Sequence, residues 1–338
     1  MRQSTAILSG TPVRLWELRF PAEQTLIHRT RLPYIHLDNL LNFAKIDRDG
    51  LVDAFLAAYL PDEALLIFFR KGQAVNAVAL TPRDRAPILI ADALQMMKKE
   101  AERSELVFCE APFQQILWMY HSGLAPLRAI SVDQQNPTKV FEGLLRDGFS
   151  GVLEFIVDGR VSYIQFTQGR FASGYFADKP DDTPIAAWIE QLLAPRSDRS
   201  RPVVAAGVCE PGDDLPEQAT VALLEAAREV FWRLAERAEQ EAPQDGLKRA
   251  LRLRDRVVRQ HPPLAAVSVT REEPLAPSVM TPQEVTTGLA LWTRQLLEQL
   301  EVVMPGAAPE VLKTATKDHR FLLQRAGFYG HLPWTVNW

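Results

Sequence analysis

The residues that could bind a metal or take part in catalysis are few and widely spaced. Asp47, Asp49 and Gly50 match part of a calcium-binding loop. That motif needs an oxygen ligand two residues before Asp47, where Lys45 stands, and a glutamate six residues after the glycine, where Leu56 stands. We therefore interpret this segment as a turn from a helix into a strand.

The six histidines and two cysteines show no spacing typical of a metal or catalytic site. Asp318 and His319 are neighbours on a predicted helix, so we expect their side chains not to face the same point. Cys109 and Cys209 have no CxxC partner, and each ends an apolar strand. Two buried thiols in separate cores are expected, with a disulfide between them as the alternative.

The sequence contains no GxSxG, Walker or GxGxxG pattern. It therefore predicts no catalytic residues, no cofactor and no metal site, and a protein that is not an enzyme. We therefore look to charged surface residues for a binding function.

One predicted helix, over residues 248–259, is rich in arginine. Such a surface could contact phosphate groups or an acidic partner. The alternative is a solvated helix face that nearby acidic residues neutralise, namely Glu236, Glu239 and Glu241. The candidate partner-binding residues are Arg249, Arg252, Arg256 and Arg259.

Composition is that of an ordinary globular protein, with 338 residues, 47% hydrophobic residues and a net charge of -4. This charge gives no global attraction to nucleic acid or to acidic membranes. The N-terminus lacks the apolar run of a signal peptide, and nothing resembles a membrane span. We expect a cytoplasmic protein that does not bind membranes, and nucleic-acid binding is unlikely on these grounds.

The chain contains one pattern of elements twice, about a hundred residues apart. Gly151 to Phe176 alternates apolar and polar residues and has turns at Asp158-Gly159 and Gln168-Gly169, which predicts a three-stranded antiparallel meander. Aligning glycines places a similar meander after Gly50. In both copies a short apolar helix precedes the meander, and a second helix and a strand ending in Cys-Glu follow it. This order predicts an internal duplication.

The fold class expected is α+β, with two pseudo-repeated domains of antiparallel meander sheets and flanking helices, plus a helical C-terminal region. The predicted parts are an N-terminal strand arm over 1–35, a first repeat over 36–123, a second repeat over 138–214 and the helical region over 215–338. A connector over 124–137 joins the repeats.

In the C-terminal region, helices are expected over 215–240 and 247–260, followed by a short strand over 265–269. Thr281, Pro282 and Glu284 have the spacing of a capping box that begins another helix. A last helix is expected from Pro309 to Ala326, with Gly327 as its stop.

The second repeat resembles the PATAN-type domain, a module of unknown chemistry in bacterial response-regulator, gliding and pilus-control proteins. The resemblance covers about 75 residues and rests on core and turn positions. These positions are residues 140–145, 151–155 and 164–166, then Gly169, Arg170, Ala172 and Gly174. The first repeat fits more loosely. The resemblance implies a protein-interaction module in signalling, without a catalytic residue set, although no receiver domain accompanies it here.

These observations predict a non-catalytic bacterial signalling or regulatory adaptor that binds another protein through its C-terminal region. One alternative is a small-ligand or nucleotide sensor with its site between the two repeats. A second is an enzyme of unrecognised type, and a nucleic-acid binder comes last. Edge strands of the meanders in two copies of the chain would form a homodimer if they paired, and this alternative stays open.

Overall fold

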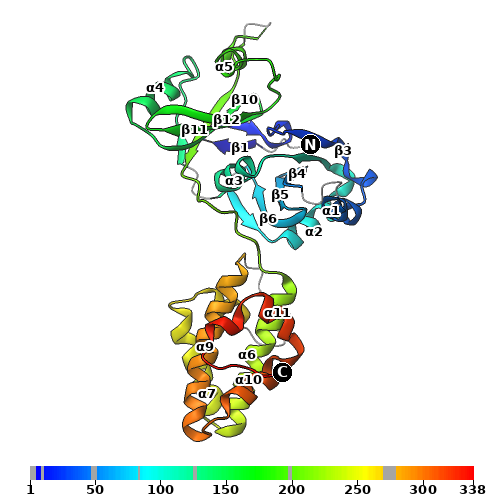
Figure 1. Ribbon diagram of the computed structural model, residues 1–338. Coiled ribbons are helices and arrows are strands. Elements are labelled where there is room, and N and C mark those ends of the chain that lie inside the picture. Colours follow the sequence, from blue (N-terminus) through cyan, green and yellow to red (C-terminus); the bar gives the residue numbers. More distant parts are fainter. Residues whose placement is uncertain are drawn as a thin grey trace. The chain divides into compact units, whose positions relative to one another are not determined.

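The computed structural model describes residues 5–8, 11–46, 52–82, 84–124, 128–196, 200–268 and 279–338. The chain divides into two compact units, Met1–Pro216 and Glu217–Trp338. The first unit contains two antiparallel sheets with flanking helices, and the second is helical (Figure 1). This confirms the α+β fold class and the helical C-terminal region. The Asp47–Gly50 segment lies outside the described residues.

The first sheet has six antiparallel strands in the order β3-β8-β4-β5-β6-β7. The strands are β3 (Gln24–Arg31), β4 (Ala54–Tyr59), β5 (Ala64–Arg70), β6 (Gln73–Leu80), β7 (Arg85–Ile88) and β8 (Glu105–Glu110). Helices α1 (Leu37–Ile46), α2 (Ile90–Lys99) and α3 (Phe113–Ser122) belong to the same repeat.

The second sheet has five antiparallel strands in the order β12-β11-β10-β13-β9. The strands are β9 (Arg128–Ile130), β10 (Gly151–Val157), β11 (Arg160–Thr167), β12 (Arg170–Phe176) and β13 (Val204–Cys209). Its helices are α4 (Lys139–Arg146) and α5 (Ile185–Leu193).

The two sheets confirm the internal duplication. The order β3-β8-β4-β5-β6 in the first sheet corresponds strand by strand to the order β9-β13-β10-β11-β12 in the second sheet. Helices α1 and α2 correspond to α4 and α5. Two details differ from the prediction. The expected connector contains β9, which forms an edge of the second sheet, and β7 extends the first sheet with a strand that the second lacks.

The N-terminal arm reaches both sheets. β1 (Thr5–Leu8) and β2 (Thr11–Arg14) form a two-stranded sheet of their own, and a short 3-10 helix, Leu15–Glu17, follows β2. β3 then pairs with β8. Arg19, in the segment between β2 and β3, contacts the second sheet. Its amide donates to the Gly159 carbonyl at 2.8 Å, and its carbonyl accepts from the Val161 amide at 2.9 Å.

Tight turns close both hairpins of the second meander where the sequence predicted them. Asp158 and Gly159 have φ values of +49° and +79°, and Gln168 and Gly169 have +51° and +74°. Two successive positive φ angles are typical of the type I′ turn, whose twist matches that of the flanking strands. A Cβ atom at Gly159 would also clash with the Glu17 carbonyl, so the arm and the turn both require glycine there.

The sheets and helices of the first unit form layers, with three hydrophobic clusters between them. α1 and α2 cover one face of the first sheet, with Leu40 and Met97 packing on it. α4 and α5 cover the outer face of the second sheet, with Leu144 and Trp188 packing on it. The remaining faces of the two sheets and α3 share a third cluster, which we call the shared core. Because both of their faces are covered, β4 and β5 read as continuous apolar runs.

An ion pair lies inside the shared core and joins the two repeats. Arg85 on β7 donates through both Nη atoms to the Glu154 carboxylate on β10, at 3.0 and 2.7 Å. Arg85 Nη1 also donates to the Ser122 carbonyl at the end of α3, at 3.0 Å. The side chains are 13% and 3% exposed. Burying two charges is costly, and the bidentate geometry with a third acceptor offsets that cost.

The second unit is built on two long helices, α6 (Val221–Glu241) and α9 (Pro282–Val303). The Thr281–Glu284 capping box is present at the start of α9. The Thr220 side chain accepts from the Leu223 amide and begins α6 later than predicted. The other helices are α7 (Gly246–Val258), α8 (Pro263–Val267), α10 (Ala308–Thr316) and α11 (Arg320–Arg325).

Two predictions for this unit are wrong. The strand expected over 265–269 is replaced by α8, whose Leu264 and Val267 are buried against α6, α7 and α9. Its alternation of apolar and small residues fits either element in so short a segment. The last helix, expected from Pro309 to Ala326, is interrupted by a 3-10 turn at Lys317–His319, which lets α11 change direction. Gly327 ends α11 with a φ of +80°, as predicted.

The buried pair generates a stability prediction. Replacing Glu154 with Ala leaves the Arg85 guanidinium in the shared core without its carboxylate, and we expect a loss of about 3 to 5 kcal/mol in the free energy of unfolding. Urea unfolding of the full chain, followed by circular dichroism, measures this loss. Asp147→Ala is the control, because its ion pair with Arg146 is exposed on both sides and should contribute little. Equal effects of the two substitutions would contradict the prediction.

Candidate functional site

The arginine-rich helix α7 begins where the Glu239 carboxylate caps it. That carboxylate accepts from the Leu247 and Gln244 amides, both at 2.8 Å. These bonds lower the pKa of Glu239, the Leu247 amide contributing most. Ala250, Leu253 and Val257 form the buried face of α7, so the helix has a fixed rotation about its own axis.

The four predicted arginines lie on an exposed side of α7, in a row that we call the arginine stripe. Arg249, Arg252, Arg256 and Arg259 are all exposed. With 3.6 residues per turn their spacing of three, four and three keeps them within one face, over about 15 Å of helix. Arg249 pairs with Asp245 at 2.5 Å. Among the described residues, Arg252, Arg256 and Arg259 form no ion pair.

The acidic residues proposed to neutralise the stripe are used elsewhere. Glu239 caps α7, and Glu241 pairs with Arg237 on its own helix at 2.5 Å. Glu236 lines a groove beside α10. Arg249 has Asp245 as its partner, and Arg252, Arg256 and Arg259 form no ion pair with a described residue.

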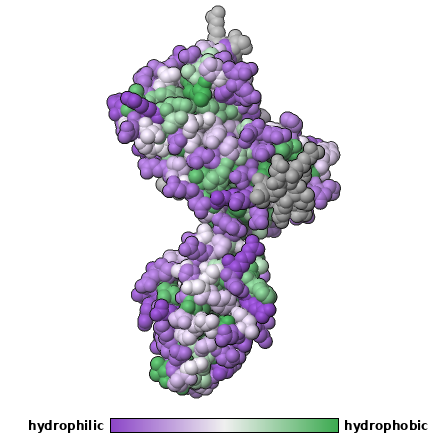
Figure 2. Space-filling model, viewed as in Figure 1, coloured by the Kyte–Doolittle hydropathy of each residue, from purple (hydrophilic) through white to green (hydrophobic). Residues whose placement is uncertain are grey.

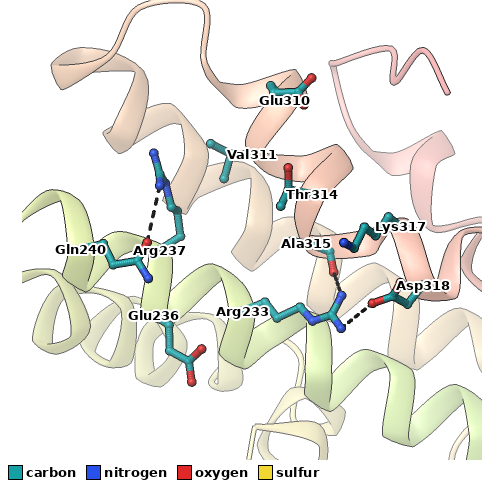
Figure 3. A pocket seen from close by; sticks show the side chains of 10 residues that line it. All are labelled: Arg233, Glu236, Arg237, Gln240, Glu310, Val311, Thr314, Ala315, Lys317 and Asp318. Atoms are coloured by element: carbon teal, nitrogen blue, oxygen red, sulfur yellow. Dashed lines mark hydrogen bonds and ion pairs between the residues drawn. The ribbon is translucent and has the colours of Figure 1, made fainter.

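A second charged feature of this unit is a groove between α6 and α10, with a volume of about 500 Å³ (Figure 3). We call it the α6–α10 groove. Its lining residues are Arg233, Glu236, Arg237, Gln240, Glu310, Val311, Thr314, Ala315, Lys317 and Asp318. No sequence pattern predicted this groove, although α6 carries charges at the i, i+4 spacing of one helix face. Figure 2 shows hydrophilic residues over most of the visible surface of this unit.

One end of the groove is closed by a network around Arg233. This side chain pairs with Asp318 at 2.6 Å and with Glu229 at 2.5 Å, and it donates to the Ala315 carbonyl at 3.3 Å. His319 Nε2 hydrogen-bonds the Glu229 carboxylate at 2.7 Å. Asp318 and His319 thus reach different residues one turn apart on α6, as expected for neighbours in sequence. They attach the turn between α10 and α11 to α6.

Both cysteines are free thiols, as expected. Cys109 is buried and Cys209 is half-buried, and both pack on the shared core, so the expectation of separate cores is wrong. Burial raises the pKa of Cys109 to about 11 and that of Cys209 to about 12. Such thiols are poor nucleophiles at neutral pH, because the thiolate is the reactive form. Within the described residues, no group of three or more His, Cys, Asp or Glu is placed to hold a metal ion.

A further groove, of about 370 Å³, lies beside the junction of the two repeats. His121 and Leu124 line it from the end of the first repeat, and Phe149, Cys209 and Glu210 line it from the second. Inside the shared core, the cavity around Arg85 and Glu154 measures only about 10 Å³. Of these two cavities, only the outer groove is large enough for a small molecule.

No protein-family model, curated protein or solved structure matches this chain. Of the helices in the described ranges, none is long and apolar enough to cross a membrane.

The network around Arg233 predicts a pH dependence. The hydrogen bond from His319 and the charge of Arg233 lower the pKa of Glu229, and the hydrogen bond from Arg233 lowers that of Asp318. A carboxylate with a lowered pKa in the folded state stabilises the fold above its ordinary pKa and loses that effect as the pH falls. At pH values below about 4 we expect the urea concentration at the unfolding midpoint to decrease. This decrease should be smaller in Glu229→Gln.

The effect should be small, because the Glu229 side chain is partly exposed and solvent screens its ion pair. Glu225→Gln, an exposed position one turn earlier on α6, serves as the control and should keep the wild-type pH profile. An unchanged profile in Glu229→Gln would rule out this contribution.

Proposed function

We propose that this protein is a non-catalytic signalling or regulatory adaptor of the bacterial cytoplasm. In this proposal the PATAN-like repeats form the scaffold of the first unit, and the arginine stripe of α7 binds an acidic surface of a protein partner.

The observation that carries the proposal is the arginine stripe itself. It presents four guanidinium groups on one exposed helix face, and three of them form no ion pair with a described residue. Arginine is suited to this role because its planar group binds carboxylates through two parallel hydrogen bonds. A local positive row on a chain of net charge -4 favours a local acidic partner surface over non-specific attraction to polyanions.

Electrostatic complementarity of this kind speeds association and selects among partners more than it adds affinity. Apolar contacts are expected to supply the rest of the binding energy. Exposed apolar side chains of the same unit that could take part are Val302, Val303, Phe321 and Trp338, of which Val302 is 84% exposed.

A second candidate function is a small-ligand sensor, which the outer groove beside Cys209 and Glu210 favours. Its volume of about 370 Å³ is within the range of small-molecule sites. Mass spectrometry of the denatured purified protein would detect a retained ligand and separate this candidate from the adaptor.

The adaptor proposal is tested with the double variant Arg252→Glu and Arg256→Glu. A partner is first captured from native cytoplasm with the full chain, identified, purified, and titrated against each variant at physiological salt. Charge reversal places acidic groups against an acidic surface, so we expect affinity to fall by roughly tenfold or more. The wild-type affinity should also weaken as salt is added.

The matched control reverses two other exposed charges, Lys99→Glu on α2 and Arg325→Glu on α11, and so changes the net charge equally. It should bind like the wild type. A partner that binds the stripe variant and the control equally well would exclude the stripe as the docking surface, and a chain that captures no protein at any salt concentration would count against the adaptor itself.

A further inference from the structure

One edge of the second sheet has no neighbouring strand among the described residues. β12 is the last strand of that sheet and pairs with β11 on one side only. Its first four residues, Arg170 to Ser173, are all exposed. A strand at the edge of a sheet presents backbone N–H and C=O groups that can pair with another strand. The second sheet can therefore be extended at β12.

The corresponding strand of the first repeat shows that this position can be covered. β6 and β12 share one irregularity, because Val75 and Ala172 are each an extra residue opposite the neighbouring strand. Despite it, β7 pairs antiparallel with β6, and the Asn76 side chain donates to the Pro216 carbonyl at 2.9 Å. Val75 and Asn76 are 6% and 1% exposed, whereas their counterparts Ala172 and Ser173 are exposed. The first repeat covers an edge that the second repeat leaves open.

The other three edges of the two large sheets have features that hinder pairing. β3 has two irregularities in its register with β8 and carries Arg29 and Arg31. β7 contains Pro87, and β9 is only three residues long. Irregular, charged, proline-containing or very short strands are ways in which proteins prevent pairing at an edge. β12 contains no proline, and Arg170 is its one charged residue. Of the four edges, β12 is thus the one suited to pairing.

Apolar side chains border this open edge. Phe171 is 46% exposed and is the register partner of Phe166, so it lies on the face of the sheet that α4 and α5 cover. Leu145, at the end of α4, is 57% exposed. It lies against the turn before β12, since a Cβ atom at Gly169 would be 2.7 Å from the Leu145 Cα atom. A strand added to β12 would shield apolar surface here from water, which favours pairing.

We propose that β12 pairs antiparallel with β12 of a second copy of this chain, so that the two five-stranded sheets join into one continuous sheet. A second copy fits this edge because it brings an open edge of its own, which is again β12. Pairing about a two-fold axis near Ala172 uses the same edge of both copies and closes the assembly at a dimer.

The charges of β12 are compatible with this pairing. The two-fold axis separates the two Arg170 residues by about four positions, or about 13 Å along the strands. Salt screens the repulsion of exposed charges over such a distance. The dimer contact lies in the first unit and the arginine stripe in the second, so this proposal does not rest on the adaptor proposal.

The test measures the oligomeric state of the full chain by analytical ultracentrifugation, from micromolar to submillimolar protein. We expect the wild type to show a reversible equilibrium between monomer and dimer. Ala172→Lys places two lysines near the two-fold axis, where like charges destabilise a strand pair. We expect its dimer dissociation constant to rise by roughly tenfold or more. Phe171→Lys removes exposed apolar surface from both copies and should weaken the dimer as well.

Gln73→Lys is the matched control, because it adds the same charge at the exposed start of β6, and it should dimerise like the wild type. Circular dichroism shows whether each variant is folded. If Ala172→Lys does not fold, Phe171→Lys decides. A wild-type chain that stays monomeric at every concentration overturns the proposal and leaves the edge to a strand of another protein. A dimer of unchanged stability in the β12 variants overturns it too. The stripe variant Arg252→Glu with Arg256→Glu should dimerise normally, so failure of the adaptor proposal would leave this result unaffected.

Discussion

Arg85 and Glu154 bring two opposite charges into the core that the two repeats share, and the arrangement of the first unit depends on how that core is filled. Each sheet has an outer face covered by its own pair of helices and an inner face that cannot be left in water. Packing the inner faces together with α3 buries them. The ion pair then adds a directional constraint, because a bidentate pair requires β7 and β10 to lie in one relative position. A purely apolar interface would tolerate small sliding motions, whereas displaced charges in a dry core would lose their partners.

The second unit solves a similar problem with helices alone. α6 and α9 bury apolar faces against each other, and shorter helices cover the remainder. Among the described residues it has no ion pair as deeply buried as Arg85 and Glu154 in the first unit. Around Arg233 ion pairs connect α6 to the turn after α10, while on α7 Arg252, Arg256 and Arg259 are exposed and form no ion pair with a described residue. Charges that stabilise the fold and charges that are free to bind a partner thus occupy different faces of the same helical unit.

This separation supports the proposal that the arginine stripe binds a partner. A folded protein that needs its arginines for stability surrounds them with carboxylates, as it does for Arg233. Arg252 and Arg256 form no ion pair with a described residue, because Asp255, the carboxylate beside them on α7, pairs with Arg254. The cost of leaving exposed cations unpaired in water is small, so the stripe can remain available without weakening the fold.

The sequence by itself determined the duplicated meanders, the I′ turns at Gly159 and Gly169, the capping box at Thr281 and the single face shared by the four arginines. These features follow from local periodicity and from backbone angles that particular residues require, and both can be read over a few residues. Only the tertiary structure decided that Arg85 meets Glu154, that β9 joins the second sheet, that the strand expected over 265–269 is a helix, and that Arg237 and Lys317 line one groove. Each of these depends on residues that are distant in the chain or on burial against other elements, and no local pattern specifies which distant partner a charged or apolar side chain will reach.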